Sequence, residues 1–261
     1  MLKEAVTKLL GEIPLTGKAL RWYASRYVDG SIVRIRQGHA KSLHWKRHHR
    51  YVNGYWVGHY EFAIQKALNR LLRPGDVFFD LGANAGFFTL IAARLVGPEG
   101  KCVAFDPSPD NAACIREQIE LNDFANCTVV MEAVADFEGE EVFSAAAPGS
   151  SEGRLGSKRA GEFETKVRVT TLDDSARRFG APQFIKMDIE GAEGRALRGA
   201  GNLLRESRPS WLIELHSAEC EEQVREVLSG AGYEFFELNG SPVPETHKLP
   251  GHVVAQPSRS T

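Results

Sequence analysis

Short apolar runs alternate with segments whose apolar residues recur at helical spacing, beginning near residue 61. Continuous apolar runs of this length predict buried strands, and the periodic segments between them predict helices. The predicted strands cover 77–81, 102–105, 127–131, 184–187, 211–215, 233–238 and 253–255. The predicted helices cover 61–72, 87–95, 109–121, a segment from Ala192, and 219–229. Alternation of this kind predicts an α/β fold with a parallel sheet, closed by the last two strands as an antiparallel pair.

Residues 136–170 interrupt this alternation. Short strands are expected near 141–145 and 166–170, and between them lies a loop of small residues at 147–153. A loop this long inside a compact domain is usually a substrate lid or a mobile segment.

The N-terminal part of the chain differs in composition from the rest. Residues 1–28 have helical spacing and predict one or two short helices, whereas residues 31–60 contain no acidic residue. The latter stretch collects Arg34, Arg36, Lys41, Lys46, Arg47 and Arg50, with His44, His48 and His49. It is either a solvated basic face or a surface that attracts an anionic substrate, such as a phosphate-bearing carrier. We therefore predict a helical and basic extension over 1–58, as a cover or substrate region, and a catalytic domain over 59–257.

The strand 77–81 leads directly into a turn that contains glycines. Asp80 lies at the end of the strand, and Gly82 and Gly86 follow it. Glycine allows the backbone to approach a ligand closely, and the carboxyl end of such a strand faces a crevice. The turn lacks the third glycine of dinucleotide binders, which favours S-adenosylmethionine over NAD. An NAD-dependent oxidoreductase remains an alternative, and the glycines could also serve only close strand–helix packing.

A methyl-donor nucleoside has an amino acid end, a ribose and an adenine but no phosphate. Its site therefore needs backbone hydrogen bonds and carboxylates in place of a phosphate cradle. The turn residues suited to the methionine end are Asp80, Gly82, Ala83, Asn84 and Gly86. Asp106, after the second strand, suits the ribose hydroxyls, which a carboxylate can bind in bidentate fashion. Glu132, Ala133 and Val134, after the third strand, are expected to line the adenine.

A second group of polar residues follows the strands at 184–187 and 211–215. The first strand leads into Asp188, Glu190 and Glu193, and the second ends at Glu214 and His216. Glu190 and Glu193 can be explained as acidic residues near a helix start. The other three are candidates for a general base, with His216 as the first choice for the proton acceptor. They could also bind a hard cation, so a divalent metal remains possible, although it is not favoured.

Several strings of residues together resemble the FkbM-type methyltransferases in order and spacing. They are Asp80 to Gly86, Phe105 to Ser108, Thr171 to Asp174, Ile185 to Glu193, Leu197 to Ala200, and Arg208 to His216. The string Lys-x-Asp-x-Glu-Gly-Ala-Glu at 186–193 is the most specific part of the resemblance, which covers roughly residues 55–255.

The resemblance implies a Rossmann-like class I methyltransferase fold, with helices on both faces of a seven-stranded sheet whose last strand is antiparallel. It also implies S-adenosylmethionine as methyl donor and O-methylation of a sugar, glycan, polyketide or other secondary metabolite. Pro107 and Ser108 join the expected cofactor-binding residues, and Glu61, in a segment like the family's entry motif, is expected to reach the methionine end. Many relatives carry Glu where this chain has Asp106, which shortens the reach to the ribose.

The composition of the chain limits the classes of partner that we expect it to bind. Hydrophobic residues make up 43% and the net charge is −2, which fits a soluble globular protein without an obligatory nucleic-acid partner. A nucleic-acid methyltransferase using residues 31–60 is a further alternative, but the acidic residues at 188–190 would repel a phosphate backbone. We expect a small-molecule, glycan or carrier-linked acceptor. The four cysteines lack metal-ligand spacing, and neither a signal peptide nor a membrane span is evident, so we expect a cytoplasmic protein.

Overall fold

The computed structural model describes residues 27–51, 53–146, 153–156 and 162–258. The chain divides into two units, residues 1–62 and 63–261, and each is described here by itself. The predicted boundary between a cover and a catalytic domain, after residue 58, remains a prediction.

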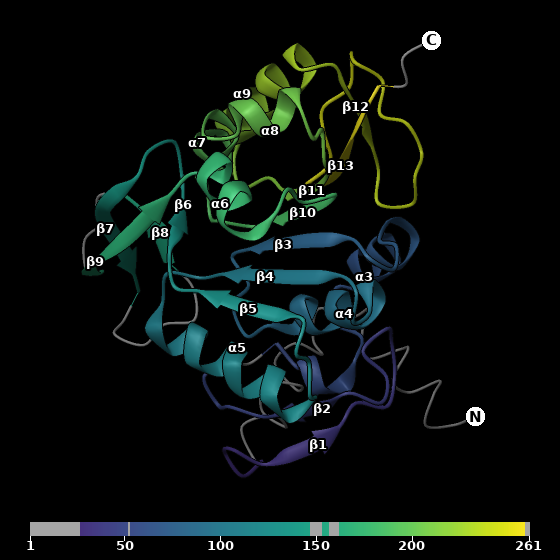
Figure 1. Ribbon diagram of the computed structural model, residues 1–261, viewed down its shortest axis with the longest axis vertical. Coiled ribbons are helices and arrows are strands. Elements are labelled where there is room, and N and C mark those ends of the chain that lie inside the picture. Colours follow the sequence, from purple (N-terminus) through teal and green to yellow (C-terminus); the bar gives the residue numbers. More distant parts are fainter. Residues whose placement is uncertain (1–26, 52, 147–152, 157–161, 259–261) are drawn as a thin grey trace. The chain divides into compact units, whose positions relative to one another are not determined.

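The predicted apolar runs form one seven-stranded sheet in the second unit (Figure 1). Its order is β12-β13-β11-β10-β3-β4-β5. The strands are β3 (Val77–Leu81), β4 (Lys101–Phe105), β5 (Cys127–Val130), β10 (Phe184–Met187), β11 (Ser210–Glu214), β12 (Tyr233–Phe236) and β13 (His252–Pro257). Neighbouring strands are parallel except where β13 pairs with β11 and β12. The last strand is therefore the antiparallel one, and the predicted fold class is confirmed.

Helices cover both faces of this sheet, because side chains of each strand point alternately to opposite faces. On one face, Phe79, Ile185 and Trp211 belong to a core that includes residues of α6 to α9. On the other face, Ala104 of β4 packs with Ile115 of α5. The helices are α3 (Phe62–Leu71), α4 (Phe87–Val96), α5 (Pro109–Leu121), α6 (Leu172–Phe179), α7 (Glu193–Arg198), α8 (Gly201–Arg205) and α9 (Ala218–Gly230).

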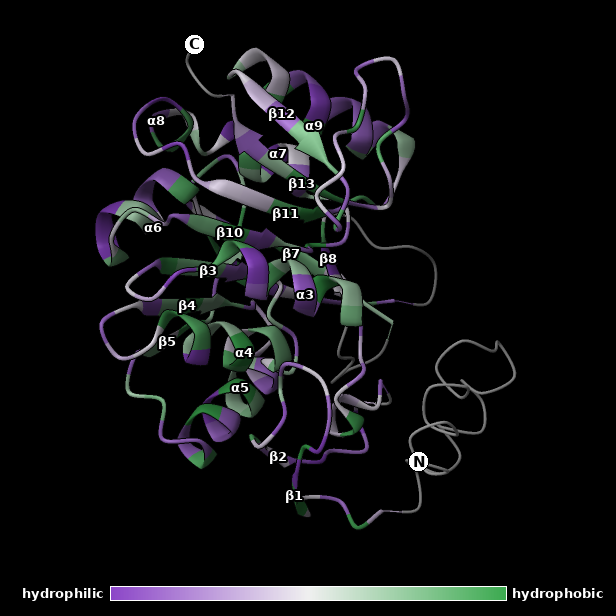
Figure 2. Ribbon diagram, turned by 90° about the vertical axis from the view of Figure 1, so that its right-hand side faces the viewer, coloured by the Kyte–Doolittle hydropathy of each residue, from purple (hydrophilic) through white to green (hydrophobic). Residues whose placement is uncertain are grey.

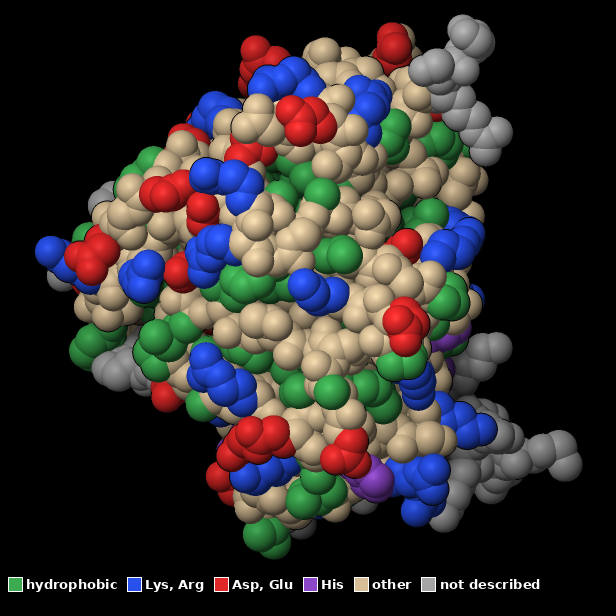
Figure 3. Space-filling view, in the orientation of Figure 1, with side chains coloured by type: hydrophobic (Ala, Val, Ile, Leu, Met, Phe, Trp, Pro, Cys, Tyr) green, Lys and Arg blue, Asp and Glu red, His purple; other side chains and the backbone are tan. Residues whose placement is uncertain are grey.

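Local sequence explains where these helices begin. The side chains of Ser108, Thr171 and Ser217 cap α5, α6 and α9 by accepting a hydrogen bond from a backbone amide three residues later. Helix α4 is apolar along almost its whole length, as Figure 2 shows, and nearly all of it is buried. Acidic and basic side chains are interspersed in the upper part of Figure 3, where Figure 1 places α6 to α9. Of the helices in the described ranges, none combines the length and apolar composition that a membrane span needs.

A second sheet occupies the region where the alternation was interrupted. Its order is β6-β9-β7-β8, and it has its own small core of Ala133, Ala135, Val167 and Val169. The strands are β6 (Ala133–Val134), β7 (Gly139–Ala145), β8 (Gly153–Leu155) and β9 (Phe163–Thr170). The two short strands expected here are thus longer and belong to a four-stranded sheet. Most of the predicted lid loop, residues 147–152, lies outside the described residues.

The described part of the first unit contains β1 (Ile32–Arg34) paired antiparallel with β2 (His44–Lys46), and the 3₁₀ helix η1 (Tyr55–Val57). The helices expected within residues 1–28 lie almost wholly outside the described residues. In the basic stretch, the Arg47 guanidinium lies 3.7 Å from the centre of the Tyr27 ring. The function of this stretch remains a prediction.

Candidate active site

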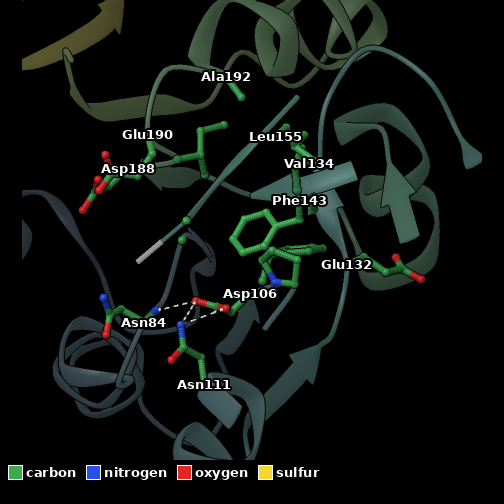
Figure 4. A pocket seen from close by; sticks show the side chains of 16 residues that line it. Asn84, Asp106, Asn111, Glu132, Val134, Phe143, Leu155, Asp188, Glu190 and Ala192 are labelled. Carbon is green, nitrogen blue, oxygen red and sulfur yellow. Dashed lines mark hydrogen bonds between the residues drawn. The ribbon is translucent and has the colours of Figure 1, made fainter. Parts of the chain in front are cut away.

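A cavity lies at the carboxyl ends of β3, β4 and β10. The strand order reverses between β3 and β10, and ligands of open α/β sheets bind at such a switch point. The cavity encloses about 610 Å³, part of it open to solvent, and is shown in Figure 4. One wall comes from the second sheet, where Phe143 and Leu155 reach the cavity.

The glycine turn after β3 forms the floor beside β10. Gly82 has φ +74°, Asn84 has φ 52° and Gly86 has φ +83°, so the turn uses left-handed backbone conformations. A Cβ atom on Gly82 would lie 1.8 Å from the backbone oxygen of Asp188. Only glycine therefore allows this turn to pack directly against the segment that carries Asp188.

Asp106, at the end of β4, is held firmly by the protein. One carboxylate oxygen accepts from the Asn84 amide at 2.9 Å, and the other accepts from the Ser108 amide at 3.0 Å. The side-chain amide of Asn111 donates to both oxygens at 3.1 Å (Figure 4). Asp106 is only 4% exposed, so its carboxylate is fixed at the cavity wall and joins the glycine turn to the start of α5.

The segment after β5 lines the cavity, but its one charged side chain does not face the cavity. Glu132, Ala133 and Val134 all line the cavity. The Glu132 carboxylate, however, pairs with Arg178 at 2.7 Å and points away from the cavity in Figure 4. This leaves Ala133 and Val134 as an apolar wall.

Asp80 lies beneath the turn, outside the set of residues that line the cavity. It is 1% exposed, accepts a hydrogen bond of 2.6 Å from the Thr89 hydroxyl, and lies 3.7 Å from the Lys186 ammonium. Lys186 stands directly opposite Asp80 in the β3–β10 register. The pair is a buried anchor between the two central strands, and a direct contact of Asp80 with the methionine end remains a prediction.

The structure thus brings most of the predicted cofactor residues to one cavity. Those that line it are Gly82, Asn84, Asp106, Pro107, Glu132, Ala133 and Val134. Asp80, Ala83, Gly86 and Ser108 support these residues without lining the cavity, and Glu61 belongs to the first unit. Sequence reasoning missed Asn111, Phe143 and Leu155. Asn111 follows the Ser108 cap by three residues, which was a usable signal, whereas the other two depend on a sheet whose pairing is not local.

The polar residues after β10 and β11 also come together. Each of Asp188, Glu214 and His216 has one polar side-chain atom in this group, and the three atoms lie within 4.8 Å of one another. His216 Nε2 is 3.5 Å from Asp188, and the Lys186 ammonium is 3.5 Å from the other oxygen of Asp188. Glu214 lies 3.2 Å from His252. Of the three predicted catalytic residues, Asp188 lines the cavity described above, and His216 lines a neighbouring groove.

These contacts change the proton affinities of the groups. The pKa of His216 is raised to about 9, chiefly by its hydrogen bond to Glu193 and then by the nearby carboxylates of Glu190 and Asp188. Burial raises the pKa of Asp188, and the Lys186 ammonium opposes this rise. The His252 imidazole, 3.2 Å away, lowers the pKa of Glu214. His216 therefore holds a proton at neutral pH, and Asp188 is a stronger base than an ordinary aspartate.

The same cluster is not well suited to a metal ion. Two carboxylates and an imidazole are suitable donors in type. However, a protonated His216 and the Lys186 ammonium already balance the charge of Asp188. We do not assign a metal site, and a divalent metal stays the less favoured alternative.

The strand order, the glycine turn and the acidic residue after β4 define a class I methyltransferase that uses S-adenosylmethionine. Residues 80–235 match the family described as "Methyltransferase FkbM domain". The chain belongs to this family, its methyl donor is S-adenosylmethionine, and the alternative of an NAD-dependent oxidoreductase is wrong.

Curated relatives match parts of the chain. A ribosomal RNA large subunit methyltransferase E of Sorangium cellulosum is 31% identical over 145 residues, covering 54% of this chain and 67% of that protein. An arsenite methyltransferase of Halobacterium salinarum is 38% identical over 55 residues, and the chain spans only 14% of its length. Among solved structures, an FkbM methyltransferase of Methylobacillus flagellatus is 17% identical with a TM-score of 0.48, over 75% of this chain and 55% of that one.

Proposed function

We propose that this enzyme methylates a hydroxyl group of a sugar, glycan or secondary metabolite, free or linked to a carrier. We further propose that Asp188, Glu214 and His216 form its catalytic group. The observation that carries the proposal is the position of Asp188, which lines the cavity together with Asp106 and the glycine turn. A base at this place can reach an acceptor oxygen beside the bound methyl donor.

The cofactor-binding residues are assigned by what they present to the cavity. The Gly82–Gly86 turn is proposed for the methionine end and Asp106 for the ribose, while the role expected of Glu61 remains a prediction. Ala133 and Val134 offer an apolar wall for the adenine. Asp80, Pro107, Ser108 and Glu132 are proposed to support these contacts. When bound, S-adenosylmethionine supplies an electrophilic methyl group on a sulfonium.

Asp188 is the best candidate for the general base. It would take the proton from the acceptor hydroxyl as that oxygen attacks, and S-adenosylmethionine held by the glycine turn and Asp106 would supply the methyl group. His216, protonated at neutral pH, faces the Asp188 carboxylate from 3.5 Å and holds it in place. Glu214 adds a second carboxylate to this group, with an oxygen within 4.8 Å of atoms of Asp188 and His216. Orientation of the acceptor can lower the activation free energy by about 7–11 kcal/mol. A general base typically increases the rate by about 10²–10⁴-fold.

A second groove supports the location of the acceptor. It encloses about 1000 Å³, is open to solvent, and shares Gly153 and Glu190 with the cofactor cavity. Its lining includes His216, Ser217 and the Arg154–Glu162 ion pair. Such a polar lining suits a hydroxylated acceptor. We propose that the reaction takes place in the cytoplasm, where cysteines such as buried Cys102 and Cys220 remain reduced.

The test has two stages. Purified enzyme is first incubated with methyl-labelled S-adenosylmethionine and a panel of glycans, macrolides and an RNA transcript. Labelled methyl ether on a glycan or macrolide supports the proposal. Label on RNA alone would favour a nucleic-acid methyltransferase instead. RNA is included because the Sorangium relative is named as a ribosomal RNA methyltransferase and because residues 31–60 are basic.

The second stage uses variants with the acceptor found. Asp188→Asn is expected to lower turnover by about 10²–10⁴-fold while cofactor affinity stays within about twofold. Exposed Glu99 provides the matched control, because Glu99→Gln removes a carboxylate far from the cavity lining. Wild-type turnover in both Asp188→Asn and His216→Ala would show that the catalytic assignment is wrong. Unchanged activity in EDTA is expected.

A further inference from the structure

Glu193, the first residue of α7, is a completely buried carboxylate beside the proposed catalytic group. Its Oε1 atom lies 3.0 Å from His216 Nδ1. Its Oε2 atom accepts a hydrogen bond of 3.1 Å from the Cys220 thiol. A buried carboxylate is costly unless it is paired and hydrogen-bonded, and here both oxygens have partners. The acidic start of a helix, which accounts for Glu193 in the sequence, does not explain these contacts.

The contact with His216 sets the direction of the imidazole ring. With Nδ1 as donor to Glu193, the other ring nitrogen faces outward and lies 3.5 Å from both Asp188 and Glu190. The partner of one ring nitrogen fixes what the other nitrogen can do. Glu193 therefore decides which nitrogen His216 presents to the Asp188 carboxylate.

The same carboxylate oxygen also holds the turn after β10. Glu193 Oε1 accepts hydrogen bonds of 3.2 Å from the backbone amides of Ile189 and Gly191. Between them, Glu190 has φ 55°, a conformation that is uncommon outside glycine, so this turn depends on such support. One oxygen atom thus connects the turn that carries Asp188 with the imidazole that follows β11.

We propose that Glu193 is a positioning residue for methyl transfer, which holds His216 and the 188–191 turn in the one arrangement that aligns Asp188. This inference rests on the function proposed above. Glu193 acts through His216 and the turn, since it is buried and does not line the cofactor cavity.

The charged groups around His216 must be considered together, because the test follows its protonation. These groups, together with one neutral thiol, come from five segments: Lys186, Asp188 and Glu190 in and after β10, Glu193 in α7, Glu214 in β11, its neighbour His252 in β13, and the Cys220 thiol in α9. Glu193 makes the shortest contact with the ring.

The decisive variant is Glu193→Gln, which keeps the size of the side chain and removes its charge. The protonation of His216 is followed by NMR as a function of pH, without acceptor, so the measurement does not depend on the identity of the substrate. We expect the His216 pKa to fall by about one unit or more. We also expect turnover on the acceptor found above to fall by about 10²-fold, with cofactor affinity within about twofold.

Cys220→Ala is the matched control, because it removes a contact to the other oxygen of the same carboxylate. It is expected to leave both the His216 titration and turnover near wild type. The double variant Glu193→Gln with His216→Ala should be slower than His216→Ala alone by a smaller factor than Glu193→Gln is slower than wild type, since part of the effect of Glu193 passes through His216 and residues that act as a unit are not additive. This comparison separates positioning from a general loss of stability, and Glu193→Asp, which keeps the charge, should restore part of the activity if the glutamine variant folds poorly.

Two results would overturn the inference: an unshifted His216 titration in Glu193→Gln, or a shifted titration with turnover equal to that of Cys220→Ala. A different result would overturn the proposed function instead. If His216→Ala and Asp188→Asn both turn over at the wild-type rate, the catalytic group lies elsewhere, whatever Glu193 does to the imidazole.

Discussion

Substituting Gly82 with alanine tests how closely the glycine turn after β3 packs against the segment that carries Asp188. Gly82 has φ +74°, a left-handed conformation that costs a residue with a Cβ atom about 1–2 kcal/mol. The new methyl group would also lie 1.8 Å from the backbone oxygen of Asp188, so one of the two segments must move. Overpacking of this kind adds about 1–3 kcal/mol. We therefore expect Gly82→Ala to lower the free energy of unfolding by about 2–5 kcal/mol in total.

The matched control is Gly75→Ala. Gly75 has φ +89°, and a Cβ atom there would meet nothing within 4 Å, so only the backbone term of about 1–2 kcal/mol applies. Urea denaturation gives the two stabilities, and isothermal titration gives the cofactor affinities. Gly82→Ala should also bind S-adenosylmethionine at least about tenfold more weakly, whereas Gly75→Ala should bind normally. Equal stabilities and equal affinities in the two variants would refute the close packing of the turn against Asp188.

Three further predictions concern stability. Thr89→Val should lower the free energy of unfolding by about 1–3 kcal/mol, because it removes the hydroxyl that donates at 2.6 Å to buried Asp80. A decrease below about 0.5 kcal/mol, which is roughly the error of urea denaturation, would contradict this pairing. Arg195→Met should cost about 1 kcal/mol in urea denaturation, because it removes the two bonds of 2.8 and 2.9 Å to Glu141 that join α7 to β7, and no change would mean that solvent replaces them. The contribution of protonated His216 should be complete below its ordinary pKa of 6.5 and be lost as pH rises to about 9, because folding raises this pKa. Solvent reaches the ring, so wild type and His216→Ala should differ in pH dependence over that interval by about 1–2 kcal/mol, and parallel curves would exclude the raised pKa.

The seven-stranded sheet could be predicted from the sequence because its strands are buried on both faces. Such strands appear as continuous apolar runs, of which Val77–Leu81 and Phe184–Met187 are examples, and helical spacing between them is equally visible. Residues at strand ends, such as Asp106 and Asp188, could be assigned to one crevice for the same reason. Parallel strands bring their carboxyl ends to one edge, so the chain order alone places these residues together.

Short strands near 141–145 and 166–170 could be predicted, but their pairing into a second sheet and the contacts that this sheet provides could not. Strand β9 is exposed at most positions, so its sequence has no apolar run, and β7 pairs with it across residues that carry no pairing signal. The sequence therefore contained no indication that Phe143 and Leu155 line the cavity. The first unit also formed two strands where only its basic composition could be read.

What the sequence determined by itself was the fold class, the family and the strand-end residues, because burial leaves a periodic pattern and family motifs are contiguous. Tertiary structure decided what each of these residues does. Asp80 turned out to be a buried partner of Lys186, and Glu193 met His216 from a different element. Such roles depend on strand register and on distances of about 3 Å between segments far apart in the chain. Electrostatics at that range also changed His216 from the first choice as proton acceptor into a group that carries its proton at neutral pH.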